Sequence, residues 1–538
     1  MKLSITIAQL NFLVGDVGGN TSKILEAIQK AEALGSDLIL FPELALSGYP
    51  PEDLLLRGDF LNAIKNSLDL IRGCAKKITV VLGFPEFDGQ TLYNSAAIFE
   101  SEKLVAIYRK QRLPNYGVFD EKRYFDAGTG ACVYKIRGIP IGITICEDAW
   151  EYGPVESSIA AGAQIILNLN ASPYHQGKSN LRELAAHARI SASKVPMVYA
   201  NLVGGQDELL FDGRSFVMNG AGSITHEAEA FKEELLSVSF EGDHALNPVG
   251  TVAPTRGSER SEVYAALVLG IKDYTIKNGF KGALLGLSGG IDSALTLALA
   301  VDALGKENVT CVSMPSRYTA DMSNEDANLQ ANLMGCEHLN IPIEPAFNAF
   351  MGMLSGPFSG AAMDVTEENI QARCRGIILM ALSNKQGKLL LTTGNKSEMS
   401  VGYATLYGDM AGGFAPLKDV PKCLVYDLCE YRNTIAQVIP RRVIERPPSA
   451  ELRPDQKDQD SLPPYEILDQ ILERYIELDQ SIEEIIAAGL PSQEVKRIIQ
   501  LIHRNEYKRR QSPPGIKISP RAFGKDRRYP ITSGFGRN

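Results

Sequence analysis

The stretch "GALLGLSGGIDSALTLALA", residues 282–300, decides the fold of the second half of the chain. Its apolar run "ALLGL" predicts a short buried strand, and "SALTLALAVDAL" has helical spacing. Between them, "SGGIDS" (288–293) places two glycines, two hydroxyls and one carboxylate at a strand-to-helix corner. Glycine lets the backbone approach an anion closely, and the free N–H groups and dipole of a helix start favour phosphate. The corner therefore predicts a phosphate-binding loop.

The side chains of this corner suggest what accompanies the phosphate. Ser288 and Ser293 can donate hydrogen bonds to phosphate oxygens, whereas Asp292 would repel them unless a cation such as Mg²⁺ lies between. The stretch lacks the Gly-Lys-Ser/Thr ending of a Walker A loop and is not G-x-G-x-x-G. The alternative is a tight turn with a helix-capping Asp. The six-residue pattern between a buried strand and a helix favours the phosphate loop.

Around this corner, the second half predicts a doubly wound parallel sheet of nucleotide-binding type. Helical patterns alternate with the strand patterns "GALLGL", "VTCVSMP" and "KLLLTTG". The first half predicts a large mixed sheet carrying helices on its outer face, with Asn20 or Thr21 capping its first helix. Its strand patterns are "KLSITIAQL", "DLILFPE", "ITVVLGFPE", "SAAIFE", "KLVAIYRKQ", "IPIGITICE", "QIILNLNAS" and "PMVYANLV", and "FVMNGAGSITHEA" predicts a hairpin.

Composition and length limit the number of domains and the class of partner. A chain of 538 residues is expected to form two or more domains, and we place them at 1–245 and 261–538 with a Pro- and Gly-rich linker at 246–260. The polar stretch 447–464 predicts a mobile loop, and a helical C-terminal part is expected to end in a basic tail from Lys508 to Arg537. A net charge of −9 argues against a nucleic-acid partner.

The sequence also bears on compartment. It has neither the apolar core of a signal peptide nor a run long enough to cross a membrane. Its eight cysteines include no C-x-x-C pair, which argues for reduced thiols rather than a disulfide framework or a zinc site. We therefore expect a cytoplasmic protein that does not bind a membrane.

"SGGIDS" resembles the pyrophosphate loop of the ATP pyrophosphatase family, which transfers AMP to an oxygen that a nucleophile, often ammonia, then displaces. The segment "LLLTTGNKSEMSVGYATLYGDMAGGFAPLKDV" (389–420), together with "SMPSRYT", "ENIQARCRG" and "EYKRRQSPPGIKIS", resembles the NAD synthetase members of that family. This resemblance implies ATP contacts at Ser288, Gly289, Gly290, Asp292, Ser293, Ser316, Arg317 and Thr393, Mg²⁺ ligands at Asp292 and Glu398, and deamido-NAD contacts at Asn369, Arg373, Asp409, Lys418, Lys508 and Arg509.

Three polar residues of the first half each end an apolar run: Glu43, Lys110 and Cys146. Their side chains are therefore expected to emerge at one edge of the sheet. Cys can act as a nucleophile, a nearby Lys⁺ would lower its pKa and stabilise an oxyanion, and Glu can move the thiol proton. Taken singly, the charged residues would be read as surface groups and the cysteine as core.

The segments around these residues resemble the nitrilase superfamily over roughly residues 1–240. The resemblance implies an α-β-β-α sandwich whose Glu-Lys-Cys triad cleaves C–N bonds. In its glutamine-cleaving branch it implies substrate contacts at Tyr116, Glu121, Ser172 and Lys178.

Together the two resemblances imply ATP-dependent amidation of deamido-NAD to NAD through an adenylated intermediate, with ammonia released from glutamine through a thioester at Cys146. They also imply an enclosed passage for ammonia, and we expect a homo-oligomer.

One alternative is a GMP-synthetase-like enzyme, which would normally carry a Cys-His-Glu glutaminase. A tRNA thiolase would favour paired cysteines and a basic surface. A non-catalytic glutamine or nucleotide sensor would be expected to lose one of Glu43, Lys110, Cys146, Asp292 and Glu398, and all five are present.

Overall fold

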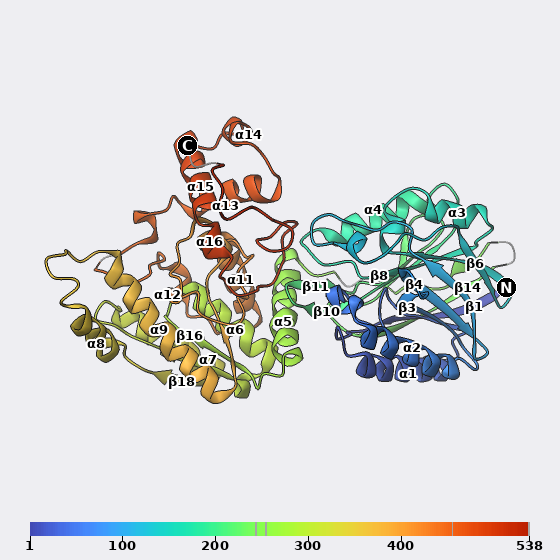
Figure 1. Cartoon of the computed structure of the whole chain (residues 1–538), viewed down its shortest axis with the longest axis horizontal. Coiled ribbons are helices and arrows are strands. Elements are labelled where there is room, and N and C mark those ends of the chain that lie inside the picture. Colours follow the sequence, from blue (N-terminus) through green and yellow to red (C-terminus); the bar gives the residue numbers. More distant parts are fainter. Residues whose placement is uncertain (243–244, 253–255, 455, 536–538) are drawn as a thin grey trace. The chain divides into compact units, whose positions relative to one another are not determined.

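In the computed structural model, two β-sheets lie face to face in the first half of the chain (Figure 1). The structure describes residues 1–242, 245–252, 256–454 and 456–535. The first sheet has the order β15-β14-β1-β2-β3-β4-β5, and the second has the order β13-β12-β9-β8-β7-β6. The strands are β1 Lys2–Gln9, β2 Leu38–Leu40, β3 Thr79–Phe87, β4 Leu92–Glu100, β5 Lys103–Arg109, β6 Cys132–Ile136, β7 Ile139–Ile145, β8 Ile165–Asn170, β9 Met197–Asn201, β12 Phe216–Met218, β13 Ile224–Glu227, β14 Glu234–Glu241 and β15 Asn247–Pro248. The predicted single large sheet is therefore two mixed sheets.

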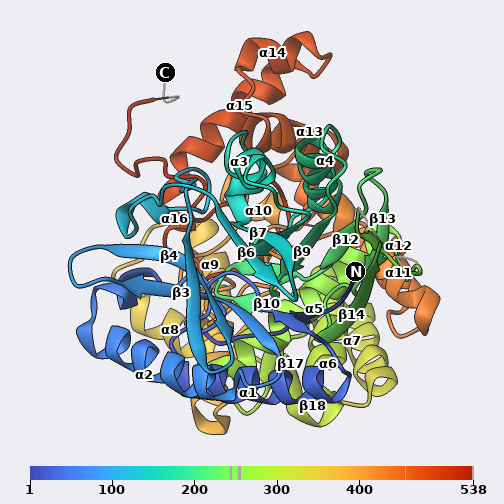
Figure 2. The ribbon, with the colours of Figure 1, turned by 90° about the vertical axis from the view of Figure 1, so that its right-hand side faces the viewer.

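Helices cover both outer faces of this pair of sheets. Helices α1 (Val17–Ala33) and α2 (Gly58–Cys74) lie against one sheet, and α3 (Pro154–Ala160) and α4 (Lys178–Ile190) lie against the other (Figures 1 and 2). Alternate residues of β1, including Ile5 and Ile7, pack between the sheets, whereas Ala8 faces α1 and α2. The result is the α-β-β-α sandwich expected from the nitrilase resemblance. The predicted hairpin is confirmed as the antiparallel pair β12–β13.

The first helix begins earlier than predicted. Its cap is Asp16, whose side chain accepts a hydrogen bond from the N–H of Gly19 at 2.9 Å. Asn20 lies inside the first turn, where its amide instead exchanges hydrogen bonds with the backbone of Leu13. The prediction of Asn20 or Thr21 as the cap was wrong because a buried polar residue can serve a neighbouring loop as well as a helix end.

The second half forms a parallel sheet with the order β18-β17-β16-β19, confirming the doubly wound arrangement. Helix α9 packs on the face that presents Leu284, Val312 and Leu390. Helix α6 contacts β16 and β17, and helix α7 contacts β17 and β18. The elements are α5 Glu259–Lys277, β16 Ala283–Gly286, α6 Ile291–Leu304, β17 Val309–Ser313, α7 Asp321–Met334, β18 Glu337–Asn340, α8 Glu344–Leu354, α9 Val365–Gln386 and β19 Leu389–Leu391. Strand β18, with the sequence "EHLN", was not predicted because it is short, polar and at the sheet edge.

The chain divides into two compact units, Met1–Arg256 and Gly257–Asn538. Strand β15 lies within the stretch 246–260 that we predicted as a linker, and it pairs with β14. Residues 253–255 of that stretch lie outside the described residues. Within the described ranges, no helix is long and apolar enough to cross a membrane. All eight cysteines are free thiols.

A bundle of helices follows the sheet of the second unit and holds its own apolar core. Its helices are α10 Lys396–Val401, α11 Lys422–Ile435, α12 Arg441–Glu445, α13 Tyr465–Leu472, α14 Ile482–Ala487, α15 Ser492–Arg504 and α16 Glu506–Arg509. The predicted basic tail is part of this fold as far as it is described (residues 536–537 lie outside the described part). Arg509, Lys517 and Arg527 are all buried.

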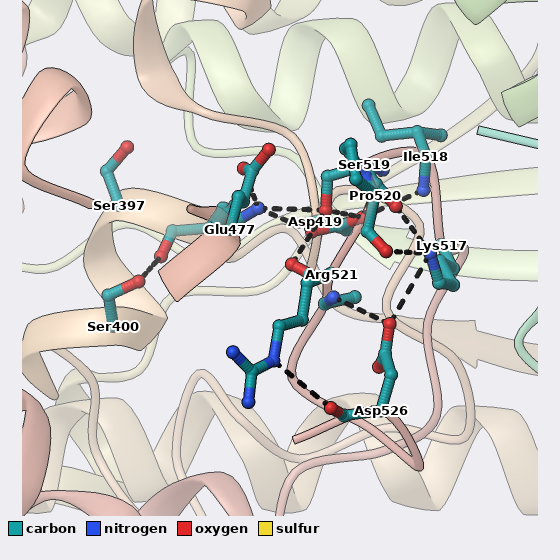
Figure 3. A network of polar contacts seen from close by, with 12 residues as sticks. Ser397, Ser400, Asp419, Glu477, Lys517, Ile518, Ser519, Pro520, Arg521 and Asp526 are labelled. Atoms are coloured by element: carbon teal, nitrogen blue, oxygen red, sulfur yellow. Dashed lines mark hydrogen bonds and ion pairs between the residues drawn. The ribbon is translucent and has the colours of Figure 1, made fainter. Parts of the chain in front are cut away.

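A buried network of charges ties the last segment to α10 (Figure 3). The ammonium of Lys396 lies 2.9 Å from Asp419 and 2.6 Å from Glu477. Asp419 also accepts hydrogen bonds from the backbone N–H groups of Ile518 and Ser519, at 2.8 and 2.7 Å. Residues about 100 positions apart in sequence therefore complete one polar cluster beside the helix that begins at Lys396.

Candidate active sites

Cys146 lies at a sharp turn between β7 and a short 3-10 helix, Cys146–Ala149. Its φ angle is +45°, in the left-handed region that residues with a side chain rarely adopt. Such strain at a strand end is common for catalytic nucleophiles, because it projects the side chain away from the sheet. The cysteine is 3% exposed, so the turn holds a buried thiol at the edge predicted from the sequence.

A buried lysine between two carboxylates accompanies this thiol. Lys110 follows β5, and its ammonium lies 2.6 Å from Glu43 Oε1 and 2.8 Å from Glu121 Oε1. Glu43 follows β2 and is fixed by two further donors, the amide of Asn94 at 2.7 Å and the backbone N–H of Ala171 at 2.9 Å. All three charged groups are buried. The structure therefore brings Glu43, Lys110 and Glu121 together as predicted.

The charges around Cys146 do not make it a thiolate at rest. Burial raises the pKa of the thiol well above its usual range, and Glu43 raises it further, which outweighs the lowering by Lys110. Lys110 does lower the pKa of the thiol, as expected, but burial and Glu43 together raise it more. Burial also raises the pKa of Glu121, to about 7. A resting thiol therefore needs a base when it reacts.

Two predicted glutamine contacts lie near the turn. Tyr116, which is 58% exposed, donates a hydrogen bond to Glu147 Oε1 at 2.9 Å. Glu147 directly follows the nucleophile, and it was missed because the sequence pattern does not show that it would meet Tyr116. Lys178 begins α4, and its ammonium lies 4.1 Å from the ring centroid of Trp150. Lys178 and Glu147 also interact electrostatically.

Ser172 is buried and held by Arg182, a residue that the sequence reasoning did not single out. Arg182 Nε donates to Ser172 Oγ at 3.0 Å, and its Nη2 donates to the Ser172 carbonyl at 2.7 Å. The guanidinium is paired with Asp212 at 2.8 Å. A buried charge needs such a partner. The "LRELAAHAR" helix gave no signal that one of its two arginines would point inward.

The phosphate loop of the second unit has the close packing that its glycines predict. Gly289 has φ +80°, and a Cβ there would lie 2.3 Å from the backbone oxygen of Ser323. Gly290 caps α6, and its N–H donates to Ser288 Oγ at 3.2 Å. The Ser288 and Ser293 hydroxyls lie 3.1 Å apart. The loop is therefore a tight, hydroxyl-lined start to a helix.

Asp292 and Glu398, the two predicted Mg²⁺ ligands, meet at a common lysine. Lys422 Nζ lies 2.5 Å from Asp292 Oδ2 and 3.2 Å from Glu398 Oε1. Burial raises the pKa of Glu398 to about 8, and Asp292 and Asp458 contribute to this rise. Among the described residues, no three or more His, Cys, Asp or Glu side chains form a group that could hold a metal ion as they stand. Lys422 was missed because it follows the segment on which the family resemblance rests.

A pocket of about 290 Å³ opens above this loop. Its polar lining includes Ser288, Gly290, Asp292, Ser293, Thr393, Glu398 and Asp409 of the predicted site, and also Lys422 and Arg375. Its apolar lining includes Val312, Met314 and Leu379. An apolar wall beside a phosphate loop suits a nucleotide, whose base is flat and whose phosphates are charged. Ser316 and Arg317 do not line the pocket, and Arg317 instead pairs with Glu344 at 2.7 Å.

Four predicted deamido-NAD contacts converge on the loop 402–409. Thr405 donates to Asn369 through its hydroxyl and to Asp409 through its N–H. Arg373 Nε donates to the Leu406 carbonyl at 3.2 Å. Lys508 Nζ donates to the carbonyls of residues 402 and 404, both at 2.8 Å. The structure thus brings Asn369, Arg373, Asp409 and Lys508 to one loop.

The other two predicted contacts lie elsewhere. Lys418 Nζ donates to the carbonyl of Pro513 at 2.8 Å. Arg509 is buried, pairs with Glu506 at 2.8 Å and donates to the Ser400 carbonyl at 2.6 Å. Neither residue lines the pocket. Both join segments of the fold in this structure.

The segment 446–458 forms one wall of the pocket. Arg446 Nη2 donates to the Gly289 carbonyl at 3.0 Å, and Glu451 accepts a hydrogen bond from Ser323 at 2.6 Å. Gln371 on α9 donates to the Leu452 carbonyl at 3.0 Å. Residue 455 of this segment lies outside the described residues. The mobility of the loop stays a prediction. Movement of the loop away from the pocket would break these three hydrogen bonds.

Both halves of the chain match known families. Residues 4–243 match the carbon-nitrogen hydrolase family, and residues 263–512 match the NAD synthase family. The glutamine-dependent NAD(+) synthetase of Xanthomonas campestris pv. campestris (strain 8004) is 50% identical over 99% of this chain and 98% of its own length. The enzyme of the same name from Thermotoga maritima is 46% identical over 99% of both chains.

A solved structure gives the same result. The glutamine-dependent NAD+ synthetase from Acinetobacter baumannii, in complex with adenosine diphosphate, is 45% identical and covers 100% of both chains with a TM-score of 0.81. A second such synthetase, from Cytophaga hutchinsonii, superposes with a TM-score of 0.85 at 24% identity, which shows a shared fold.

Proposed function

This chain belongs to the family of glutamine-dependent NAD(+) synthetases, and we propose that its two described sites divide the family's reaction between them. The protein is a ligase that uses ATP and glutamine to amidate deamido-NAD. That activity excludes the GMP-synthetase-like and sensor alternatives. The observation that carries the division is a buried Glu-Lys-Cys group in one unit and a phosphate-loop pocket in the other.

In the first unit, we assign glutamine hydrolysis to Cys146 with Glu43 and Lys110. Glu43 takes the proton from the thiol as sulfur attacks the side-chain amide carbon, and the Lys110 ammonium stabilises the resulting oxyanion. The C–N bond then breaks, the proton passes to the leaving ammonia, and a γ-glutamyl thioester stays on the cysteine. Glu43 next activates the water that releases glutamate. Tyr116, Glu121, Ser172 and Lys178 are the proposed contacts for the glutamine.

In the second unit, we assign ATP to the pocket above the phosphate loop. Ser288, Gly290 and Ser293, which line the pocket, would hold the pyrophosphate together with Gly289 between them, and Thr393 of the same lining would contact the nucleotide. Deamido-NAD would bind along the 402–409 loop, so that its nicotinate carboxylate attacks the α-phosphorus and releases pyrophosphate. Ammonia then displaces AMP. Ser316, Arg317, Lys418 and Arg509 are also proposed contacts, and on binding Arg317, Lys418 and Arg509 would exchange the protein partners that they have in this structure.

Mg²⁺ fits this site through its oxygen donors. Asp292 and Glu398 would hold it, and it would neutralise the charge of the pyrophosphate when bound. Three carboxylates, those of Asp292, Glu398 and Asp458, share the single ammonium of Lys422. Carboxylate oxygens gathered at one point are the ligands that a hard cation prefers. Lys422 would then be free to move toward phosphate oxygens.

A thioester is the sharpest test of the first assignment. The full-length enzyme is mixed with glutamine, quenched in acid and digested, and the peptides are mapped by mass spectrometry. We expect a γ-glutamyl group on Cys146 and on no other of the eight cysteines. A γ-glutamyl group on another cysteine, or none in an enzyme that still hydrolyses glutamine, would contradict it.

We also propose that ammonia passes between the sites through an enclosed passage, and that the enzyme is a cytoplasmic homo-oligomer. Near neutral pH, free ammonia is mostly ammonium, which cannot attack an adenylate. The enzyme is given amide-¹⁵N glutamine with excess unlabelled ammonium. Label retained in the NAD supports a passage, and dilution to the bulk ratio contradicts it. Light scattering during size-exclusion chromatography measures the number of subunits.

A further inference from the structure

Asp148 lies two residues after Cys146 and touches none of the groups to which a chemical step is assigned above. Its carboxylate is fully buried in the 3-10 helix Cys146–Ala149. A buried carboxylate persists only when its oxygens are well paired. Both oxygens of Asp148 are paired, and the donors come from two separate segments of the chain.

The first segment holds the lysine of the site. Asp148 Oδ1 accepts hydrogen bonds from the backbone N–H groups of Gln111 and Arg112, at 3.1 and 2.8 Å. These are the two residues directly after Lys110. The Lys110 backbone is fixed as well, because its N–H donates to the Asn94 carbonyl and its carbonyl accepts from the Gly128 N–H, both at 2.8 Å.

The second segment holds the nucleophile. Asp148 Oδ2 accepts a hydrogen bond from the backbone N–H of Ile145 at 3.0 Å, which closes the turn around Cys146. The same oxygen accepts from the hydroxyl of Tyr108 on β5 at 2.7 Å. The left-handed conformation of Cys146 is unfavourable for a residue with a side chain, so it needs restraint from outside.

We propose that Asp148 is a positioning residue for the glutaminase reaction, which sets the separation between the Cys146 thiol and the Lys110 ammonium. One carboxylate bridges the strand end before the cysteine and the residues after the lysine. The thiol and the oxyanion-stabilising charge are thereby held as one unit. This inference rests on the proposed Glu43–Lys110–Cys146 triad.

The test is Asp148→Asn in the full-length enzyme. An amide has one acceptor oxygen, so either orientation turns an NH₂ group toward backbone N–H donors. The turn at Cys146 and the segment after Lys110 then lose the carboxylate that joins them and move apart. We expect kcat for glutamine hydrolysis to fall about 10²-fold, the usual cost of misplacing a reacting group by about 1 Å. KM for glutamine and the ammonia-supported synthesis should change little, because the glutamine contacts and the second unit are untouched.

A second readout separates positioning from stability. The rate at which iodoacetamide alkylates Cys146 should fall in Asp148→Asn, because the thiol moves away from Glu43, the base that takes its proton. Asp37→Asn is the matched control: Asp37 accepts from the Ser4 N–H at 2.9 Å and pairs with Arg137 at 2.7 Å, at the opposite end of β2 from Glu43. It should lower thermal stability and leave both kcat and alkylation unchanged.

Tyr108→Phe removes one of the four hydrogen bonds and keeps the inference testable if Asp148→Asn does not fold. It should lower kcat in the same direction by a smaller factor. Wild-type kcat and alkylation rate in both variants, or in Tyr108→Phe alone when Asp148→Asn is unfolded, would overturn the inference. Failure of the triad itself would look different, because Cys146→Ala would then retain glutaminase activity.

Discussion

The glutaminase site and the nucleotide pocket hold buried charge in different ways. In the first, Lys110 is locked between Glu43 and Glu121, and each group that would react is already in place. In the second, Lys422 bridges Asp292 and Glu398 where a cation and phosphates are expected. With the proposed roles, the first site is complete without its substrate, whereas the second would exchange partners when its substrate arrives. We therefore expect hydrolysis to depend on fixed geometry and adenylation to depend on rearrangement.

The largest effect on activity should come from removing the nucleophile of the first site. Cys146→Ala should reduce glutamine-supported NAD synthesis by on the order of 10⁴-fold or more, because no other group can form the thioester. Ammonia-supported synthesis should be retained, since the second unit is intact. Both rates are measured from NAD formed, with Cys74→Ala on α2 as the control. Loss of both activities in a folded variant would show that the two sites do not divide the reaction.

The second largest effect should come from the cation site. Asp292→Asn is expected to lower both activities about 10²–10³-fold, because an amide is a poor ligand for a hard cation. The Mg²⁺ concentration needed for half the maximal rate should rise. Asp302→Asn, on the same helix and paired with Arg432 at 2.7 Å, should keep its activity. Near-normal ammonia-supported rates in Asp292→Asn would mean that the carboxylate only supports the helix start.

A smaller effect should follow from loosening the wall of the pocket. Arg446→Ala removes the bond to Gly289 and should raise KM for ATP about tenfold, the worth of one hydrogen bond to a charged group. Trypsin should cut at Arg453 or Lys457 more slowly when ATP, deamido-NAD and Mg²⁺ are present. Arg441→Ala, an exposed residue of α12, is the control. Equal cleavage with and without these ligands would argue against a closing loop.

The smallest effect concerns stability and pH. Glu121 has a pKa of about 7 in the folded protein against 4.5 for an ordinary Glu, so the folded state holds the proton more tightly. Its contribution to stability is therefore present at low pH and is lost as pH rises from about 4.5 to 7, by at most about 1.4 kcal/mol per pH unit.

Glu121→Gln should remove this dependence. Denaturation midpoints of the first unit, measured in the full-length chain at pH 5, 6, 7 and 8, should favour the wild type most at pH 5 and progressively less above it. Glu100→Gln, a partly buried carboxylate on β4, gives the background. A difference between wild type and Glu121→Gln that stays constant with pH would mean that the carboxyl is already ionised at pH 5.

The sequence predicted the parts of both sites that stand at the ends of apolar strands. Glu43, Lys110, Cys146 and the phosphate loop follow β2, β5, β7 and β16, whose patterns are strong. Lys422 and Arg182 were missed because each begins or lies within a helix that carries other charged residues, and the sequence pattern does not show which of them points inward. Only the three-dimensional fold distinguishes an inward-pointing basic residue from its solvated neighbours.

Burial of charge also limited the predictions of the fold. The basic residues near the C-terminus predicted a basic tail, and the acidic partners of that tail were not predicted: Lys517 lies 3.4 Å from Asp526, and Arg527 lies 3.2 Å from Glu506. These partners become neighbours only after folding, so local composition did not reveal them. The raised pKa of the Cys146 thiol could not be predicted for the same reason, because burial of the thiol and the nearness of Glu43 arise only on folding.

The cluster at Lys396 has a consequence for synthesis of the protein on the ribosome. The carboxylate of Asp419 gains its hydrogen bonds from Ser519 only after 100 further residues have been added to the chain. At about 5–20 residues per second, this takes about 5–20 s. Throughout it, the helix that carries Glu398 borders an unfinished polar cluster. The nascent second unit therefore cannot reach its final form until residue 519 has been made, while the first unit is already available to fold. A messenger truncated shortly before codon 519 would yield a chain with buried charges exposed, which is a substrate for proteases rather than a slower enzyme.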